Sequence, residues 1–452
     1  MKKNLFLVII LTLLCAMQAR ADVEINENNF PDAKFRNYLL NQSYGSDGVI
    51  TNEEISTIKT ISFDDGNGIS SLKGIEYFKE LTSFFCIYTS LTSLDLTKNT
   101  KLVIIECTNS SLTTINVPKS NALKYLICSD NQLTTLDVSY CTGLEKLHCT
   151  NNKLVSLNVS GCTALKELLC FKNQLPTLTV SECTALTNLS CSENLLTELD
   201  LSGATTLQQL SCGSNLLTSL NLSGFASLKS MECSYNHLTM LNVSGCNALT
   251  LLYCNDNQLV SLNVMQTPAL QHLYCQNNQL TLLEIANNTA LSSILCSNNK
   301  LISLDASGCT ALAGLFCYDN NLITLNATGC TELTEMYCYQ NQINGENMNE
   351  FIESLPTTSN GRLEILYYDN EDNVMTTTQV AAAKSKGWIP WYSDGSGWKE
   401  YTGNDPSGIE SIRNEQLENN AETIWYDLNG RRLTGEPALK GVYIMDGRKV
   451  IK

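Results

Sequence analysis

The cysteines of this chain recur with a period of 21 residues, and that period restricts the chain to few architectures. Self-similarity at a fixed interval of about 20 to 50 residues is typical of solenoids, in which each repeat is a turn of chain stacked on the next. A single turn cannot bury its own apolar face, so its neighbours must complete the core. Thirteen cysteines carry the period: Cys86, Cys107, Cys128, Cys149, Cys170, Cys191, Cys212, Cys233, Cys254, Cys275, Cys296, Cys317 and Cys338.

The repeat unit is leucine-rich. From Leu123 to Gly143 it reads L-x-x-L-x-C-x-x-N-x-L-x-x-L-x-V-x-x-C-x-x. Alternate residues of a strand face opposite sides, so Leu126 and Cys128 should point into the coil while Tyr125 and Ile127 point outward. We therefore predict a leucine-rich-repeat solenoid of about 13 coils of 21 residues. Its parallel β-sheet should lie on the concave face, with short turns or 3-10 segments on the convex face.

Asparagine occupies a fixed position three residues after the strand cysteine. A backbone that turns inside the stack leaves N–H and C=O groups without strand partners, and an inward amide can bond both at about 1 kcal/mol net per bond. The two earliest units carry Thr89 and Ser110 there, so we expect this ladder to be weakest at that end. The asparagines are Asn131, Asn152, Asn173, Asn194, Asn215, Asn236, Asn257, Asn278, Asn299, Asn320 and Asn341.

A second set of cysteines shares another phase of the period: Cys141, Cys162, Cys183, Cys246, Cys309 and Cys330. Together the two sets resemble the cysteine-ladder repeats of internalin-like secreted bacterial proteins, across residues 60–345. That resemblance implies free, buried thiols. Disulfides are the alternative for a secreted, cysteine-rich chain, and metal binding would need C-x-x-C pairs or histidines in ligand geometry. We favour cysteine as a small core residue and expect neither metal nor cofactor.

The first residues predict export. Lys2 and Lys3 precede an apolar stretch that ends at Ala19-Arg20-Ala21, which is the pattern of a signal peptide over residues 1–21. Residues 22–59 should form a helical cap for the first coil, with Thr51 and Glu54 as a capping box. Residues 43–54 are spaced like a calcium loop, but Ser43 and Gly45 replace two carboxylates, so calcium is the minority interpretation.

At the other end, residues 346–403 are predicted to form an α+β cap, in which Trp388, Trp391 and Trp398 seal the last coil. A polar linker over residues 404–423 leads to a short β module at 424–452. That module resembles the C-terminal sorting domain of type IX secretion substrates through Asp427-Leu-Asn-Gly-Arg-Arg432 and Lys440-Gly-Val-Tyr443. The resemblance implies a protein secreted from, or held on the outer-membrane surface of, a Gram-negative bacterium.

The composition disfavours nucleic-acid binding and catalysis. The chain has 29 Lys and Arg against 45 Asp and Glu, a net charge of −16, which disfavours nucleic acid as a partner. It has only three histidines, and no common catalytic or nucleotide-binding motif is present, so we do not expect an enzyme. No segment after the leader is apolar for long enough to span a bilayer. We expect a monomer.

The candidate site is a stripe of large side chains at positions that flank the cysteines of the last five strands. Contiguous exposed aromatic residues usually mark an interaction surface, although such residues also stack favourably along a sheet without binding anything. We predict an adhesin-like protein that binds a protein or glycan partner, of host origin if the internalin resemblance extends to function. A self-associating structural protein is the alternative, and a secreted hydrolase is the least favoured. The predicted site residues are Leu251, Tyr253, His272, Tyr274, Leu295, Phe316, Tyr318, Glu335, Tyr337 and Tyr339.

Overall fold

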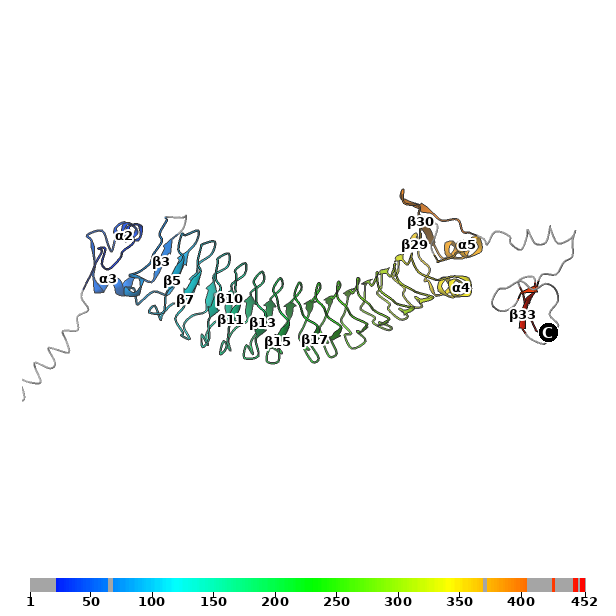
Figure 1. The fold of residues 1–452 in the computed structure, drawn as a ribbon, viewed down its shortest axis with the longest axis horizontal. Coiled ribbons are helices and arrows are strands. Elements are labelled where there is room, and N and C mark those ends of the chain that lie inside the picture. Colours follow the sequence, from blue (N-terminus) through cyan, green and yellow to red (C-terminus); the bar gives the residue numbers. More distant parts are fainter. Residues whose placement is uncertain are drawn as a thin grey trace, which may run out of the picture.

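The computed structural model describes residues 22–63, 68–368 and 372–404, together with the backbone of three short strands between residues 425 and 451. The predicted signal peptide, nearly all of the predicted linker and the turns of the C-terminal module lie outside the described residues. Between the two caps, the coils stack along a gently curved axis (Figure 1). The architecture is the predicted leucine-rich-repeat solenoid.

One strand per coil builds a continuous parallel sheet, which we call the long sheet. Neighbouring strands pair in a register of 21 residues, as in Leu126 with Leu147 and Leu147 with Leu168. The thirteen coil strands are β4 (Ser83–Cys86), β6 (Ile104–Glu106), β8 (Tyr125–Ile127), β10 (Lys146–His148), β12 (Glu167–Leu169), β14 (Asn188–Ser190), β16 (Gln209–Ser211), β18 (Ser230–Glu232), β20 (Leu251–Tyr253), β22 (His272–Tyr274), β24 (Ser293–Leu295), β26 (Gly314–Phe316) and β28 (Glu335–Tyr337).

The opposite side of the coils is more extended than the sequence led us to expect. Turns connect three-residue strands there, and among the described residues the 3-10 conformation is confined to η1 (Ile75–Tyr77). These strands form parallel pairs. They are β5 (Ser93–Asp95), β7 (Thr114–Asn116), β9 (Thr135–Asp137), β11 (Ser156–Asn158), β13 (Thr177–Thr179), β15 (Glu198–Asp200), β17 (Ser219–Asn221), β19 (Met240–Asn242), β21 (Ser261–Asn263), β23 (Leu282–Glu284), β25 (Ser303–Asp305) and β27 (Thr324–Asn326).

The asparagine ladder bonds the turn backbone as predicted. Asn215 Nδ2 donates to the carbonyl oxygens of Cys191 at 3.1 Å, Cys212 at 3.0 Å and Gly213 at 3.2 Å. Its Oδ1 accepts from the Leu196 N–H at 3.0 Å, so one side chain joins two coils. At the N-terminal end the amide is replaced by a contact of 2.9 Å between the hydroxyls of Thr89 and Ser110, which provides fewer bonds.

A second feature of the turn was not predicted. The residue before each ladder position has a positive φ of 51–57° in all thirteen coils. Asn and Asp tolerate this left-handed conformation best, and they supply it at Asn109, Asp130 and Asn151. Lys172 and Glu193 adopt the same conformation. The bonds of the asparagine ladder therefore hold the turn even where the local residue does not favour it.

The cysteines lie inside the stack. None of the nineteen cysteines among the described residues forms a disulfide, and all of them are buried. Burial raises the pKa of Cys128, Cys170 and Cys254 to about 12 because a thiolate would lose its hydration. These thiols therefore stay protonated at neutral pH, which is the state expected of core residues.

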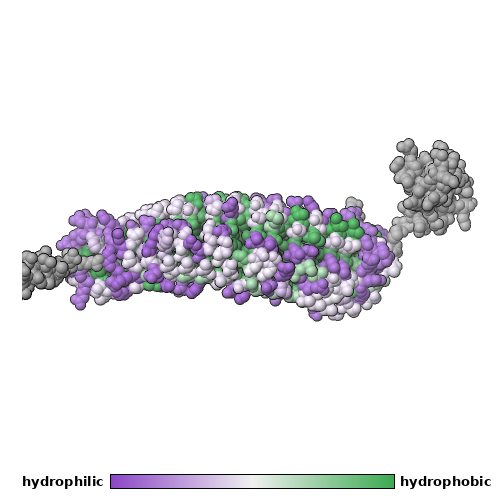
Figure 2. Space-filling model, turned by 90° about the horizontal axis from the view of Figure 1, so that it is seen from below, coloured by the Kyte–Doolittle hydropathy of each residue, from purple (hydrophilic) through white to green (hydrophobic). Residues whose placement is uncertain are grey.

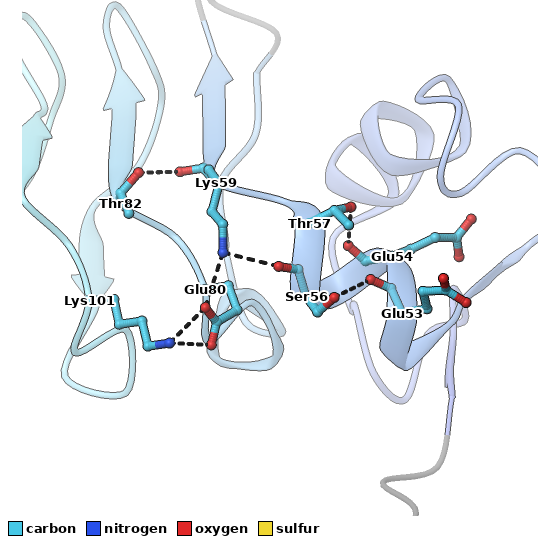
Figure 3. Close-up of polar contacts among 8 residues, drawn as sticks. All are labelled: Glu53, Glu54, Ser56, Thr57, Lys59, Glu80, Thr82 and Lys101. Atoms are coloured by element: carbon cyan, nitrogen blue, oxygen red, sulfur yellow. Dashed lines mark hydrogen bonds and ion pairs between the residues drawn. The ribbon is translucent and has the colours of Figure 1, made fainter.

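The N-terminal cap covers the first coil with two helices, α2 (Ala33–Leu40) and α3 (Asn52–Thr57), and a small sheet of β1 (Val23–Glu24) and β2 (Val49–Ile50). Phe30 and Phe35 are fully buried in it. Strand β3 (Thr60–Phe63) then pairs with β4. Figure 3 shows how Glu80 joins the cap to the coils, since its carboxylate contacts Lys59 Nζ at 3.1 Å and Lys101 Nζ at 2.6 Å.

The C-terminal cap continues the long sheet. It comprises α4 (Gly345–Ser354), β29 (Gly361–Tyr367), α5 (Thr377–Ser385), β30 (Trp388–Ser393) and β31 (Trp398–Glu400), and β29 pairs with β28 on one side and β30 on the other. Trp388 is fully buried and donates its indole N–H to the Pro356 carbonyl at 2.8 Å, so it seals the stack. Trp391 and Trp398, which were also expected to seal the last coil, are instead half-buried. Beyond the cap, β32 (Trp425–Tyr426), β33 (Val442–Met445) and β34 (Arg448–Ile451) form a small antiparallel sheet.

Candidate functional site

The ten predicted site residues share the outward side of the long sheet. Five of them, from Tyr253 to Tyr337, occupy one position on five consecutive strands, because the register places Tyr253 beside Tyr274, then Leu295, Phe316 and Tyr337. Leu251 and His272 form a parallel column two residues earlier, which reaches Glu335 and continues to its register partner Arg362 on β29. Tyr318 and Tyr339 follow the strand cysteines. Nine of the ten are half-buried, and Glu335 is exposed.

The tyrosines stack face to face along the solenoid. Tyr253 and Tyr274 have ring centroids 4.5 Å apart and an interplanar angle of 11°. Tyr318 and Tyr339 repeat the arrangement at 4.7 Å and 12°. Each ring therefore covers a face of its neighbour. Within each pair, two of the four ring faces are therefore closed to a ligand.

The stripe does not stop at the last coil, and this continuation was missed from the sequence. The Tyr339 ring lies 5.3 Å from Tyr367 and 5.4 Å from Trp398, both of which belong to the C-terminal cap. The register partners Met336, Leu363 and Pro390 are 27 residues apart rather than 21, so the period of the repeats could not place these rings. We call the whole array the aromatic surface: Tyr253, Tyr274, Phe316, Tyr318, Tyr337, Tyr339, Tyr367, Trp391 and Trp398.

An arginine lies within this surface. The Arg362 guanidinium is 5.0 Å from the Trp391 ring and 6.0 Å from the Tyr337 ring. Its Nε also donates to Glu364 Oε1 at 2.7 Å, and that carboxylate is almost fully buried. Burial raises the pKa of Glu364, while the guanidinium opposes the shift. The pair was not recognised in the sequence because Arg362 and Glu364 are an ordinary surface combination until the register sets them between two aromatic residues.

The hydroxyls of Tyr337 and Tyr339 stay protonated at neutral pH. Burial raises the pKa of Tyr337 and Tyr339, and the nearby Glu364 carboxylate adds to the shift of both. Both phenols can therefore donate as well as accept a hydrogen bond at neutral pH.

Charge is distributed unevenly along the coils. Residues 98–172 contain eight lysines against five acidic residues, a net charge of +3, whereas residues 173–344 contain two lysines against eleven acidic residues, a net charge of −9. The part of the aromatic surface from Tyr253 to Tyr339 thus lies on the acidic coils. In the view of Figure 2, apolar residues also gather over the central and C-terminal coils, while the N-terminal part is mostly polar.

Two carboxylates elsewhere on the long sheet are bonded by neighbouring groups. In the middle coils Glu232 accepts from the Gly213 N–H at 3.0 Å and from the Ser234 N–H at 2.9 Å. In the early coils Glu167 contacts His148 at 2.9 Å and Lys146 at 3.1 Å. Both carboxylates are therefore satisfied within the protein.

The remaining candidate sites show fewer features of a binding site. A groove of about 570 Å³ between α4 and strands β25 and β27 is lined by Asp305, Glu350 and Glu353, among others. Within the described residues no group of three or more His, Cys, Asp and Glu side chains is arranged to hold a metal ion. In the calcium-like loop, Glu54 Oε2 already accepts from the backbone and hydroxyl of Thr51, each at 2.8 Å, which completes the predicted capping box.

No family model and no curated protein matches this sequence. Among solved structures, the chain is similar to the functional domain of InlJ from Listeria monocytogenes, which includes a cysteine ladder. The match has 24% identity, covers 82% of this chain and 81% of that chain, and has a TM-score of 0.53. A leucine-rich-repeat protein of Leptospira interrogans matches with 20% identity, 68% and 91% coverage and a TM-score of 0.51. Both similarities concern the fold. The InlJ match agrees with the internalin-like, cysteine-ladder resemblance of the sequence. No helix in the described parts of the chain is both long and apolar enough to cross a bilayer.

Proposed function

We propose that this protein is an exported, adhesin-like binding protein that captures a protein partner on the aromatic surface. The observation that carries the proposal is the continuity of that surface, which extends without a break from Tyr318 through Tyr339 to Tyr367 and Trp398. Half-buried tyrosine and tryptophan residues combine rigid apolar area with hydrogen-bonding groups, and they are enriched where proteins bind one another.

A protein partner suits this surface better than a glycan. Sugar rings bind aromatic residues by lying on a free ring face, but in the Tyr253–Tyr274 pair each ring covers one face of the other. The edges and hydroxyls that remain exposed are suited to the mixed apolar and polar side chains of a polypeptide. No catalytic activity is proposed. Export rests on the signal-peptide pattern of residues 1–21, and surface display in a Gram-negative bacterium rests on the type IX resemblance of residues 424–452.

The test is capture of a partner from mucosal and bacterial extracts by the mature chain and by a variant with Tyr274→Ala and Tyr337→Ala. We expect the variant to lose at least tenfold in capture while its melting temperature stays nearly unchanged. Tyr140→Ala is the matched control, since that tyrosine is 69% exposed and lies off the surface. Equal loss from Tyr140→Ala, or from substitutions around Ser190 and Gly213, would refute the location.

Self-association is the second candidate function, and the opposite net charges of residues 98–172 and 173–344 favour it. Two copies could place the lysine-bearing coils of one against the acidic coils of the other. Sedimentation of the mature chain at increasing concentration and at low and high salt tests this. A monomer under all conditions, which we expect, would exclude it.

A further inference from the structure

We propose that the protein partner binds through a cationic segment, with lysine or arginine side chains placed against the C-terminal half of the aromatic surface. This inference rests on the proposed function and adds the chemistry of the partner. The surface has two unpaired carboxylates, its coils are acidic, and it already holds an arginine of its own.

Two carboxylates beside the aromatic rings form no ion pair with any described residue. Asp319 follows Tyr318 directly, and Glu335 lies two residues before Tyr337 on the same face of β28. Both side chains are exposed, and neither forms an ion pair within the described part of the chain. By contrast, Glu232 and Glu167 on the earlier coils are bonded by neighbouring groups. The two carboxylates beside the aromatic rings are therefore available to a ligand.

Arg362 shows how this surface holds a cation. This residue already places a guanidinium between Tyr337 and Trp391 and bonds it to a carboxylate. The surface therefore combines aromatic rings and carboxylates in a way that holds one cation in place. Next to it, Asp319 directly follows Tyr318 and forms no ion pair with any cation among the described residues.

The spacing fits an extended segment. Asp319 and Glu335 belong to neighbouring coils, ~4.8 Å apart, and their positions in the repeat differ by five residues, at most ~16 Å along the strand. A chain rising ~3.3 Å per residue spans the resulting ~17 Å in about six residues, with alternate side chains on the same side. The segment expected is thus short and carries basic residues at alternate positions.

The experiment measures binding of three synthetic eight-residue peptides to the mature chain by fluorescence anisotropy: alternating Arg-Ser, alternating Gln-Ser and alternating Glu-Ser. We expect only the arginine peptide to bind, with an affinity that falls at least tenfold between 50 and 300 mM salt because the contacts are ionic. A variant with Asp319→Asn and Glu335→Gln should weaken binding at least tenfold. The matched control, Asp305→Asn with Glu332→Gln, removes the same charge away from the surface and should change binding less than threefold.

If the control variant loses as much affinity for the arginine peptide as the Asp319 and Glu335 variant does, the effect is one of net charge and the proposal is overturned. Equal binding of the Gln-Ser peptide, or binding of a neutral oligosaccharide such as chitotetraose instead, would also overturn it. If the tyrosine variant loses its natural partner while the Asp319 and Glu335 variant keeps it, the cationic chemistry is wrong and the proposed function stands. If neither variant affects capture, both are wrong.

Discussion

The thiol of Cys309 lies 3.2 Å from the backbone carbonyl oxygen of Ile285, which belongs to the previous coil. Cys162 and Cys330 repeat this contact with Val138 and Ala306 at 3.2 and 3.1 Å. Where the second cysteine set is interrupted, Asn288 donates its Nδ2 to the equivalent carbonyl of Val264 at 2.9 Å. This position therefore serves as a donor between coils as well as a core position, which was not foreseen when cysteine was interpreted as a packing residue alone.

The two cysteine sets should respond oppositely to serine. At Cys309 a hydroxyl keeps the donor, so Cys309→Ser should destabilise the protein less than Cys309→Ala, which loses a bond of about 1 kcal/mol. At Cys128, whose pKa is raised to about 12 by burial, a hydroxyl is desolvated, and Cys128→Ser should cost about 1–3 kcal/mol and more than Cys128→Ala. Guanidinium unfolding of the four variants measures this. The same ranking at both positions would contradict the assignment.

The asparagine ladder should be costly to interrupt in the middle of the solenoid. Asn215→Ala removes three donated bonds and one accepted bond from buried backbone groups, and we expect a loss of about 2–4 kcal/mol in the free energy of unfolding. Asn215→Thr, which copies the residue at Thr89, should recover part of that loss. If urea unfolds Asn215→Ala at the same concentration as the wild type, the turn backbone is stable without the hydrogen bonds of the ladder.

Alkaline pH should unfold the protein steeply. The pKa of buried Cys170 and Cys254 is raised to about 12 and that of Cys246 to about 11, whereas an unfolded thiol has a pKa of about 8.5. Between these values the unfolded chain binds fewer protons than the native one, so stability falls as pH rises, by about 1.4 kcal/mol per thiol and pH unit.

Unfolding in denaturant from pH 7.5 to 10.5 under reducing conditions measures this slope. Cys170→Ala should reduce the slope of stability against pH by the contribution of one thiol. A flat profile, or rapid alkylation of the native thiols at pH 8, would mean that the ladder is not enclosed.

Arg362 should stabilise the C-terminal cap through Glu364. Arg362→Ala leaves a buried carboxylate without its partner, and we expect a loss of about 1–3 kcal/mol, moderated because the arginine side chain is 36% exposed. The deficit should shrink at pH 5, because the raised pKa of Glu364 lets the carboxylate take up a proton. The double variant Arg362→Met with Glu364→Leu should return close to wild type. A pH-independent deficit would argue against Glu364 as its cause.

The sequence was informative wherever the period held. Leu126, Cys128 and Asn131 were assigned inward positions from alternation and spacing, and all three are buried. The stripe from Tyr253 to Tyr337 was aligned correctly because the 21-residue interval is also the strand register. The stacking of its rings was not predictable, since side-chain torsions depend on neighbours in adjacent coils.

The sequence by itself determined the repeat, the strand register and the inward cysteines, because a fixed period and a two-residue alternation leave one way to stack the coils. Only the tertiary structure decided that Tyr367, Trp391 and Trp398 extend the stripe and that Arg362 lies between Tyr337 and Trp391. In the cap the period is lost, and the neighbours of a side chain are then set by the packing of α4 and α5 beside the last strands. Contacts between residues at irregular separations follow from that packing and not from the local sequence.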